Sequence, residues 1–140
     1  MMLSEKDRKA VGKRLEELDK PVRLINFTQQ LECQFCHETR TLLEELASIS
    51  DKVSLEVYNF QTDREKRDTY GVDKIPATVI QGEKDLGIRY YGIPSGYEFA
   101  SLLDTMRLVS RGDSGLSQDT RRRLQEVRKP LHLEVFVTPT

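Results

Sequence analysis

The sequence predicts an α/β fold in which a helix precedes a strand–helix–strand–helix unit, a β-hairpin and a closing helix, in the order α-βαβα-ββα. Short apolar and β-branched runs alternate with longer segments whose apolar residues recur at helical spacing. The 140 residues suffice for one ordinary domain. A Cys-x-x-Cys motif stands where the first strand gives way to a helix, which places the chemistry of the chain at that junction.

The chain is expected to open with a helix over residues 3–18, where apolar side chains recur among Lys, Glu and Arg. Ser4, with Asp7 three residues further on, is typical of a helix N-cap, and Pro21 ends the segment. Residues 22–28 are rich in apolar and β-branched side chains, so we expect a strand buried on both faces.

A second helix and a second strand follow. An apolar stripe at helical spacing runs from Phe35 to Ile49, so the Cys-x-x-Cys motif lies at a helix N-terminus. Residues 53–60 alternate between apolar and polar and predict a strand, and residues 63–70 predict a short charged helix that Gly71 can end. This order favours a parallel pair of strands covered by helices, with functional loops at the strand ends.

The C-terminal half predicts a hairpin and a third core-facing helix. Residues 77–80 and 88–91 are β-like and are joined by a Gly-containing loop of hairpin length. Residues 97–109 have an apolar face at helical spacing. Three further elements complete the prediction: a linker at 110–117, a basic helix at 118–129 and a strand at 131–138, which repeats the character of the first strand.

The composition disfavours several classes of function. The chain has 22 Lys and Arg against 23 Asp and Glu, a formal net charge of -1, so no strong field attracts nucleic acid or anionic lipid. No apolar run approaches the ~20 residues of a membrane-spanning helix, and the first ten residues are charged where a signal peptide would be apolar. We therefore expect a cytoplasmic protein with no nucleic-acid partner and no membrane partner.

The two cysteines, Cys33 and Cys36, are too few for a disulfide framework. A thiol attacks a disulfide only as the thiolate, and a helix N-terminus stabilises that anion through unpaired N–H groups and its dipole. We expect Cys33, at or before the first helical turn, to be the exposed nucleophile. Cys36, inside the helix on the same side, is then the resolving thiol.

The motif has other uses in proteins, and three of them compete with a redox role. Residues 33–37 match C-x-x-C-H, the attachment motif of c-type haem, but no export signal is present and the flanking elements leave no obvious haem cavity. The cysteines could supply half of a zinc site, but the nearest other soft ligand beyond the motif, His132, lies far along the chain, which leaves open a metal shared across a dimer. Inert core cysteines are disfavoured beside Glu32 and Gln34. We expect no cofactor and no metal.

Pro76 is the second informative position, because Ile75-Pro76-Ala77-Thr78 opens a strand. A Pro cannot donate to the hydrogen-bond ladder, so its plain role is to mark the start of the strand. The functional interpretation is a cis Ile75–Pro76 peptide beside the Cys-x-x-Cys motif. Such a bond would turn the Ile75 backbone toward an incoming extended chain, which could pair with it by strand addition.

Taken together, residues 22–109 resemble the thioredoxin and glutaredoxin superfamily: a strand, a Cys-x-x-Cys at a helix start, Ile-Pro-Ala-Thr opening a hairpin, and a closing helix. The resemblance implies a thioredoxin-like three-layer fold with a central mixed sheet (βαβα-ββα) preceded by an N-terminal helix. Cys33-Gln34-Phe35-Cys36, residues 91–99 and residues 135–140 look closer still to the protein disulfide oxidoreductases, or glutaredoxin-like domain proteins, of hyperthermophilic archaea and bacteria. That similarity implies a thermophilic source and a family with two thioredoxin-like units in tandem.

The resemblance also implies residue roles and a division of the chain. Cys33 and Cys36 take the roles of the redox pair, and Gln34, Phe35, Ile75 and Pro76 are the expected substrate-binding residues. Residues 1–110 are expected to be a thioredoxin/glutaredoxin-like domain. Residues 111–140 are expected to be a linker, helix and first strand of an incomplete second unit, because the second motif of that family is absent here. Many thioredoxins carry a buried acid before the motif, but Phe27 and Thr28 stand there in this chain, so no proton acceptor for Cys36 is identified.

The leading hypothesis is a thiol-disulfide oxidoreductase that acts on protein disulfides, in which Cys33 attacks, a mixed disulfide forms and Cys36 resolves it. The alternative is a non-catalytic thioredoxin-like binding module that uses the motif for metal or structural bridging. The expected partners are protein dithiols and disulfides and a thioredoxin-reductase-like flavoprotein. The strand at 131–138, without the rest of its sheet, could also pair with a second copy to form a homodimer.

Overall fold

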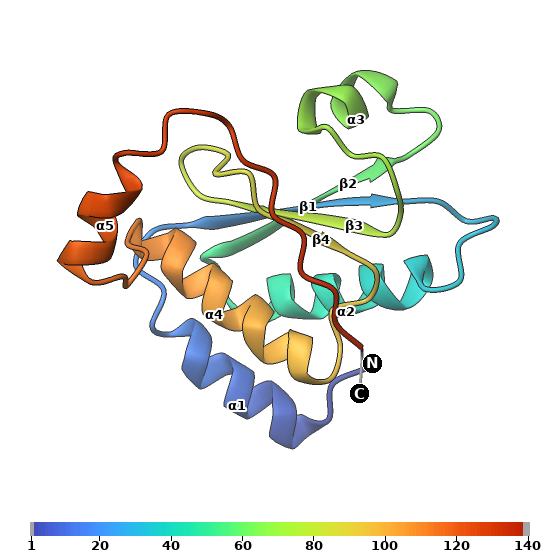
Figure 1. The fold of residues 1–140 in the computed structure, drawn as a ribbon. Coiled ribbons are helices and arrows are strands. Elements are labelled where there is room, and N and C mark those ends of the chain that lie inside the picture. The colour runs from blue at the N-terminus through green and yellow to red at the C-terminus, as the bar shows by residue number, and fades with distance from the viewer. Residues whose placement is uncertain (1, 139–140) are drawn as a thin grey trace.

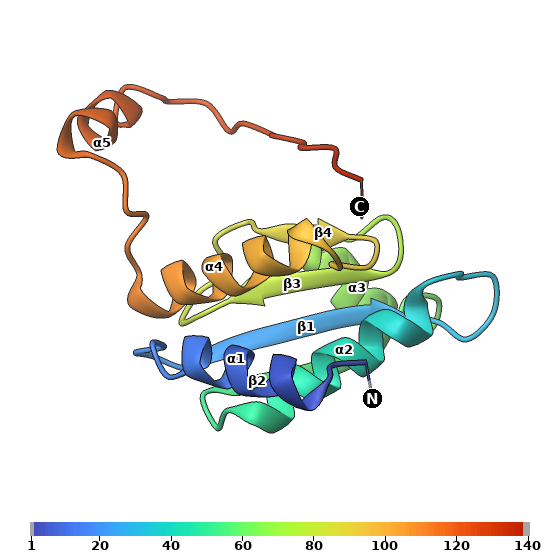
Figure 2. The same cartoon turned by 90° about the horizontal axis from the view of Figure 1, so that it is seen from below.

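The computed structural model describes residues 2–138. A four-stranded sheet forms the middle of three layers, with α1, α2 and α4 on one face and α3 on the other (Figures 1 and 2). No helix in this part of the chain has both the length and the apolar character needed to cross a membrane. The elements are α1 (Glu5–Leu15), β1 (Val22–Thr28), α2 (Cys36–Ile49), β2 (Val53–Asn59), α3 (Arg64–Tyr70), β3 (Ala77–Gln81), β4 (Arg89–Tyr91), α4 (Tyr97–Arg111) and α5 (Gln118–Leu124). The predicted order and the three-layer mixed-sheet fold are confirmed.

The sheet is mixed and has the strand order β2-β1-β3-β4. β1 pairs in parallel with β2 and antiparallel with β3, and β3 pairs antiparallel with β4. β1 is largely buried, as its continuous apolar character predicts, whereas β2 and β4 lie at the edges and are only partly covered. The central position of β1 carries the loop that follows it to the middle of one end of the sheet.

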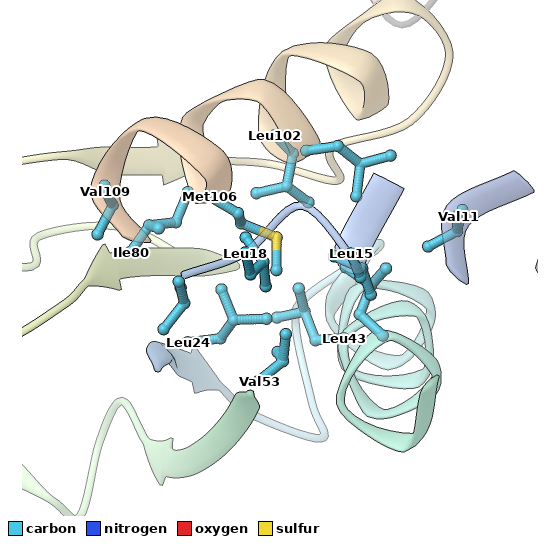
Figure 3. Close-up of a cluster of buried hydrophobic side chains, with 13 residues drawn as sticks. Val11, Leu15, Leu18, Leu24, Leu43, Val53, Ile80, Leu102, Met106 and Val109 are labelled. Carbon is cyan, nitrogen blue, oxygen red and sulfur yellow. The ribbon is translucent and has the colours of Figure 1, made fainter. Parts of the chain in front are cut away.

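Alternation along β1 divides the core between the two faces of the sheet. Leu24 packs with side chains of α1, α2 and α4, among them Leu15, Leu43 and Met106 (Figure 3). Ile25 and Phe27 point to the other face and form a smaller cluster beside α3. The larger cluster fixes α2 against the sheet, and α2 carries one of the two cysteines at its start.

The predicted helix ends are confirmed where the sequence signals them. Ser4 and Asp7 form a reciprocal capping box at the start of α1. Gly71 ends α3 with a φ of 64°, a left-handed conformation that costs glycine little. Gly112 ends α4 in the same way, with a φ of 65°.

The predicted linker at 110–117 begins too early, because α4 continues to Arg111. Ser110 is fully buried. Its hydroxyl accepts the Asp19 N–H at 2.7 Å and donates to the Lys20 carbonyl at 2.7 Å. These two bonds tie the end of α4 to the turn before β1, so Ser110 is a structural residue and not part of a loop.

The predicted basic helix at 118–129 is shorter than expected. α5 ends at Leu124, and the following turns are closed by i→i+3 hydrogen bonds, such as the one from the Val127 N–H to the Leu124 carbonyl. Every described residue from Arg111 onward is exposed. A short helix that buries no apolar face has little besides its own backbone bonds to extend it.

The predicted strand at 131–138 is wrong for this chain. The segment runs past the β4 side of the sheet without joining it (Figures 1 and 2). His132 Nε2 and Glu134 Oε1 lie 2.8 Å apart on one side of it. Val135 and Phe136 are 85% and 88% exposed, so the apolar pattern of this segment finds no sheet and no core among residues 2–138.

Ser110→Ala is expected to lower the free energy of unfolding by about 1–2 kcal/mol, because the Asp19 N–H and the Lys20 carbonyl both lose their partner. Urea denaturation followed by circular dichroism measures the change. Ser101→Ala, on the exposed face of the same helix, is the matched control and should stay within about 0.5 kcal/mol of the wild type. Equal values for the two variants would contradict the assigned role of Ser110.

Candidate active site

The Cys-x-x-Cys motif lies where the sequence predicts it, between the end of β1 and the start of α2. β1 ends at Thr28, a loop follows, and Cys36 is the first residue of α2. Cys33 and Cys36 form a disulfide, with their Cα atoms 5.5 Å apart. The structure therefore shows the oxidised form of the pair.

The two sulfur-bearing residues differ in exposure. Cys36 is 1% exposed, because it lies on the face of α2 that also buries Thr39 and Leu43 against the core. Cys33 precedes the helix and is partly exposed. An incoming reagent can therefore reach Cys33 but not Cys36, which is the asymmetry that the predicted roles of nucleophile and resolving thiol require.

The N-terminus of α2 favours a negative charge at the motif. Phe35 is the N-cap residue and makes no side-chain capping bond. Its carbonyl accepts the Thr39 N–H at 3.0 Å and the Thr39 hydroxyl at 2.7 Å, which fixes the first turn. No N-cap side chain competes for the free N–H groups of that turn, so they and the helix dipole can stabilise a thiolate. Gln34 and Phe35 are exposed beside the disulfide.

The predicted cis peptide between Ile75 and Pro76 is present. Phe27 of β1 pairs with Ala77 of β3, so Pro76 lies alongside Thr28 at the end of the sheet from which the motif loop leaves. Pro76 is buried and its carbonyl accepts the Gly92 N–H at 2.9 Å, whereas Ile75 is partly exposed. The structure thus brings the Ile75–Pro76 pair and the Cys-x-x-Cys motif to the same end of the sheet.

Asn26 is a buried polar residue that the sequence analysis missed. It is fully buried on the α2 side of the sheet, whereas Phe27 points to the α3 side. The Asn26 side-chain amide donates to the Ala77 carbonyl at 3.0 Å. Its Oδ1, and Oγ1 of the paired Thr78, have no hydrogen-bond partner among the described residues. The signal was available, since Asn26 is the one amide in an otherwise apolar stretch of strand.

A cleft beside Cys33 was also missed. It has a volume of about 690 Å³ and lies between the loop after β1, the start of α2 and the end of β2. Its α2 wall carries His37 and Arg40, and its opposite wall includes Tyr58 and Asp63. Sequence spacing indicates that His37 and Arg40 share a helix face, but only the pairing of β1 with β2 shows what faces them.

Hydrogen bonds set the charge state of the wall that β2 contributes. Desolvation raises the pKa of Tyr58, and its hydrogen bond to Glu56 at 3.1 Å adds to that rise, so the phenol is neutral at neutral pH. Partial desolvation of Glu56 acts in the opposite direction to its hydrogen bonds from Arg23 and Tyr58, which prevail and lower the pKa of that carboxyl. This wall therefore has fixed charges.

Residues 2–138 contain no group of three or more His, Cys, Asp and Glu side chains placed to hold a metal ion. His132 pairs with Glu134 in the C-terminal segment, and His37 lies on α2 in the cleft.

The sequence matches known proteins over most of this fold. The thioredoxin domain family matches residues 25–104. NADH dehydrogenase of Bacillus subtilis is 28% identical over 99 residues, which are 71% of this chain and 17% of that protein. The alkyl hydroperoxide reductase AhpF of Xanthomonas campestris pv. phaseoli is 27% identical over the same shares of each chain. The chain therefore spans about a sixth of the length of these curated relatives.

Solved structures give similar results. A protein disulfide oxidoreductase from Aeropyrum pernix superposes with a TM-score of 0.81 at 27% identity, over 90% of this chain and 56% of that one. The alkyl hydroperoxide reductase AhpF of Enterococcus faecalis superposes with a TM-score of 0.79 at 27% identity, over 92% of this chain and 62% of that one. Fasciola hepatica thioredoxin, at 20% identity and a TM-score of 0.54, shares the fold.

After reduction, we expect Cys33 to be alkylated by iodoacetamide at least about tenfold faster than Cys36, because it is the accessible sulfur and the helix N-terminus stabilises its thiolate. Quenching the reaction at intervals and quantifying each modified peptide by mass spectrometry gives both rates. In guanidinium chloride, where the fold is lost, the two rates should converge. Faster labelling of Cys36 in the folded protein would reverse the expected order.

Proposed function

The chain belongs to the thioredoxin domain family, and on that premise we propose that it is a thiol-disulfide oxidoreductase acting on protein disulfides. The observation that carries the proposal is a disulfide between an accessible Cys33 and a buried Cys36 at the N-terminus of α2. The similarity to a protein disulfide oxidoreductase over 90% of this chain supports it.

In the reducing direction, the Cys33 thiolate attacks a substrate disulfide and forms a mixed disulfide, and one substrate thiol leaves. Cys36 then attacks Cys33, releases the second substrate thiol and closes the disulfide seen in the structure. The buried position of Cys36 supports this division, because a resolving thiol needs to reach only its neighbour. The free N–H groups of α2 stabilise Cys33 whenever it is a thiolate.

The substrate is proposed to lie on the β3 side of the disulfide, against Gln34, Phe35, Ile75 and Pro76. Gln34 and Phe35 are exposed, and Ile75 is partly exposed at the start of β3. An extended substrate chain could pair with the Ile75 backbone as an added strand. This would hold the substrate cysteine beside Cys33 without requiring a particular sequence around it.

The two sulfurs carry both electrons of the exchange. We infer that a thioredoxin-reductase-like flavoprotein supplies or removes them. The similarity to proteins named NADH dehydrogenase and alkyl hydroperoxide reductase supports this partner, since those names indicate a route for electrons from NADH or toward a peroxide.

Several further expectations stand as proposals. A cytoplasmic location rests on the charged first ten residues, and a thermophilic source on the resemblance to hyperthermophile proteins. Residues 1–110 as the complete domain, and 111–140 as part of a second unit, are supported by the exposure of every described residue from Arg111 onward. A homodimer through residues 131–138 would cover their exposed apolar side chains.

Cys33→Ser is expected to abolish the reduction of insulin disulfides in the presence of dithiothreitol, because no other thiol of the chain is accessible. Turbidity of the precipitating insulin B chain measures the rate. A Cys33→Ser variant that matches the wild type would contradict the assignment of the nucleophile.

Cys36→Ser is expected to accumulate mixed disulfides with substrate proteins, because Cys33 still attacks while the resolving thiol is absent. Non-reducing gels and mass spectrometry detect the adducts, with Cys33→Ser as the matched control that should form none. Adducts confined to the Cys33→Ser variant would mean that the roles are reversed. A wild-type chain that binds zinc stoichiometrically and reduces no disulfide would favour the non-catalytic module.

A further inference from the structure

The cleft beside Cys33 lies on the opposite side of β1 from the predicted substrate-binding residues. It opens toward β2, whereas Ile75 and Pro76 precede β3, and β1 separates these two strands in the sheet. Of the described residues that line the cleft, Cys33 alone belongs to the predicted site. A substrate joined to Cys33 would therefore have two flanks, and its second flank lies at this cleft.

The α2 wall of the cleft has hydrogen-bond donors that are free to bind a ligand. Arg40 Nε donates to Glu44 Oε1 at 2.8 Å, and within residues 2–138 its two terminal nitrogens have no further partner. The His37 imidazole makes no hydrogen bond to the described residues, and it offers an N–H donor in either protonation state. The Arg40 guanidinium is charged at any physiological pH.

The facing wall uses its acceptors internally. Asp63 Oδ2 accepts the Asn59 N–H at 2.6 Å, and Asn59 Oδ1 accepts the Gln61 N–H at 2.9 Å. Lys66 Nζ lies 5.6 Å from the centroid of the Tyr58 ring, which adds a cation beside this wall. The cleft therefore has free donors on one wall and an acceptor side that is already engaged with its own backbone, an arrangement suited to a ligand that only accepts.

We propose that this cleft receives the part of a peptide substrate next to its disulfide, and that it favours substrates with a carboxylate beside the reactive cysteine. The inference rests on the proposed disulfide exchange at Cys33. A carboxylate only accepts hydrogen bonds and a guanidinium only donates them, so Asp or Glu complements Arg40 in both charge and hydrogen bonding. An amide of equal size lacks the charge, and a Lys at the same place is repelled.

The chemical step balances without another reactant. As the Cys33 thiolate attacks, the substrate S–S bond breaks and a bond from Cys33 to one substrate sulfur forms, while the other substrate sulfur leaves as a thiolate and takes up a proton. Cys36 then loses its proton and attacks Cys33, which releases the remaining substrate thiolate. Two electrons pass from the dithiol to the substrate, and the chain ends in the disulfide state of the structure.

The test uses three symmetrical peptide disulfides in which Asp, Asn or Lys flanks the single cysteine of each peptide. The full chain is reduced and freed of reductant, and the second-order rate constant of its oxidation by each peptide is measured at low ionic strength. Each rate constant is divided by that of the same peptide disulfide with dithiothreitol, which removes differences in intrinsic reactivity. We expect the Asp peptide to react about two- to fivefold faster than the Asn peptide, as an exposed ion pair allows, with the Lys peptide slowest.

Charge variants show whether Arg40 causes the preference. Arg40→Gln should bring the Asp-to-Asn ratio close to one, and Arg40→Glu should invert it. Arg111→Gln removes the same charge from the last residue of α4, outside the cleft, and should keep the wild-type ratio. Added salt should reduce the wild-type preference, because the contact is partly exposed.

Equal normalised rates for the three peptides, or a ratio that Arg40→Glu leaves unchanged, would overturn the proposed preference while disulfide exchange itself still stands. A reduced wild-type chain that none of the three peptides oxidises would instead contradict the proposed function, and the preference with it. The two failures are therefore distinguishable in the same experiment.

Discussion

β1 lies between β2 and β3, and its pairing on these two sides fixes the position of every group at the candidate site. Its parallel register with β2 sets one wall of the cleft, and its antiparallel register with β3 places Pro76 alongside Thr28. The loop that leaves β1 then carries Cys33 to the middle of this end of the sheet. A shift of one residue in either register would turn side chains such as Leu24 out of the core, so burial of the strand also holds the site in place.

The two flanks of Cys33 present different chemistry. On the β3 side, a buried cis proline and an exposed Phe35 offer backbone and apolar contacts, which accept many sequences. On the β2 side, Arg40 and His37 offer free donors. Such a division would let general affinity come from one flank and a charge preference from the other, because backbone pairing is indifferent to side-chain charge.

The buried side of the site is less polar than a fully solvated thiol would encounter, yet it is not wholly apolar. Cys36 starts α2 against the face of the sheet that carries Asn26 and Thr78, and each of these has an oxygen without a partner in the described part of the chain. In the sequence, Phe27 and Thr28 stand before the motif and no acid is found there. The structure shows that Asn26 faces the α2 side, because side chains alternate along the strand and Phe27 faces α3.

Most elements could be predicted from the sequence because their signals are local. The stripe that includes Leu42 and Leu46, the Ser4–Asp7 cap and the stop at Gly71 each depend on neighbours within a few residues. The failures have the opposite character. Ser110 has the sequence context of a linker but is buried by bonds to residues about ninety positions earlier, and residues 131–138 have a strand pattern but no strand to pair with among those described.

The sequence by itself determined the redox motif, its place at a helix N-terminus and the Ile75–Pro76 pair, because each is written in consecutive residues. Only the tertiary structure decided which of the two sulfurs is accessible to solvent, which strand flanks the motif on each side, and that Arg40 faces a cleft. Those properties depend on the order β2-β1-β3-β4, and strand order is a choice among long-range pairings that local periodicity does not encode.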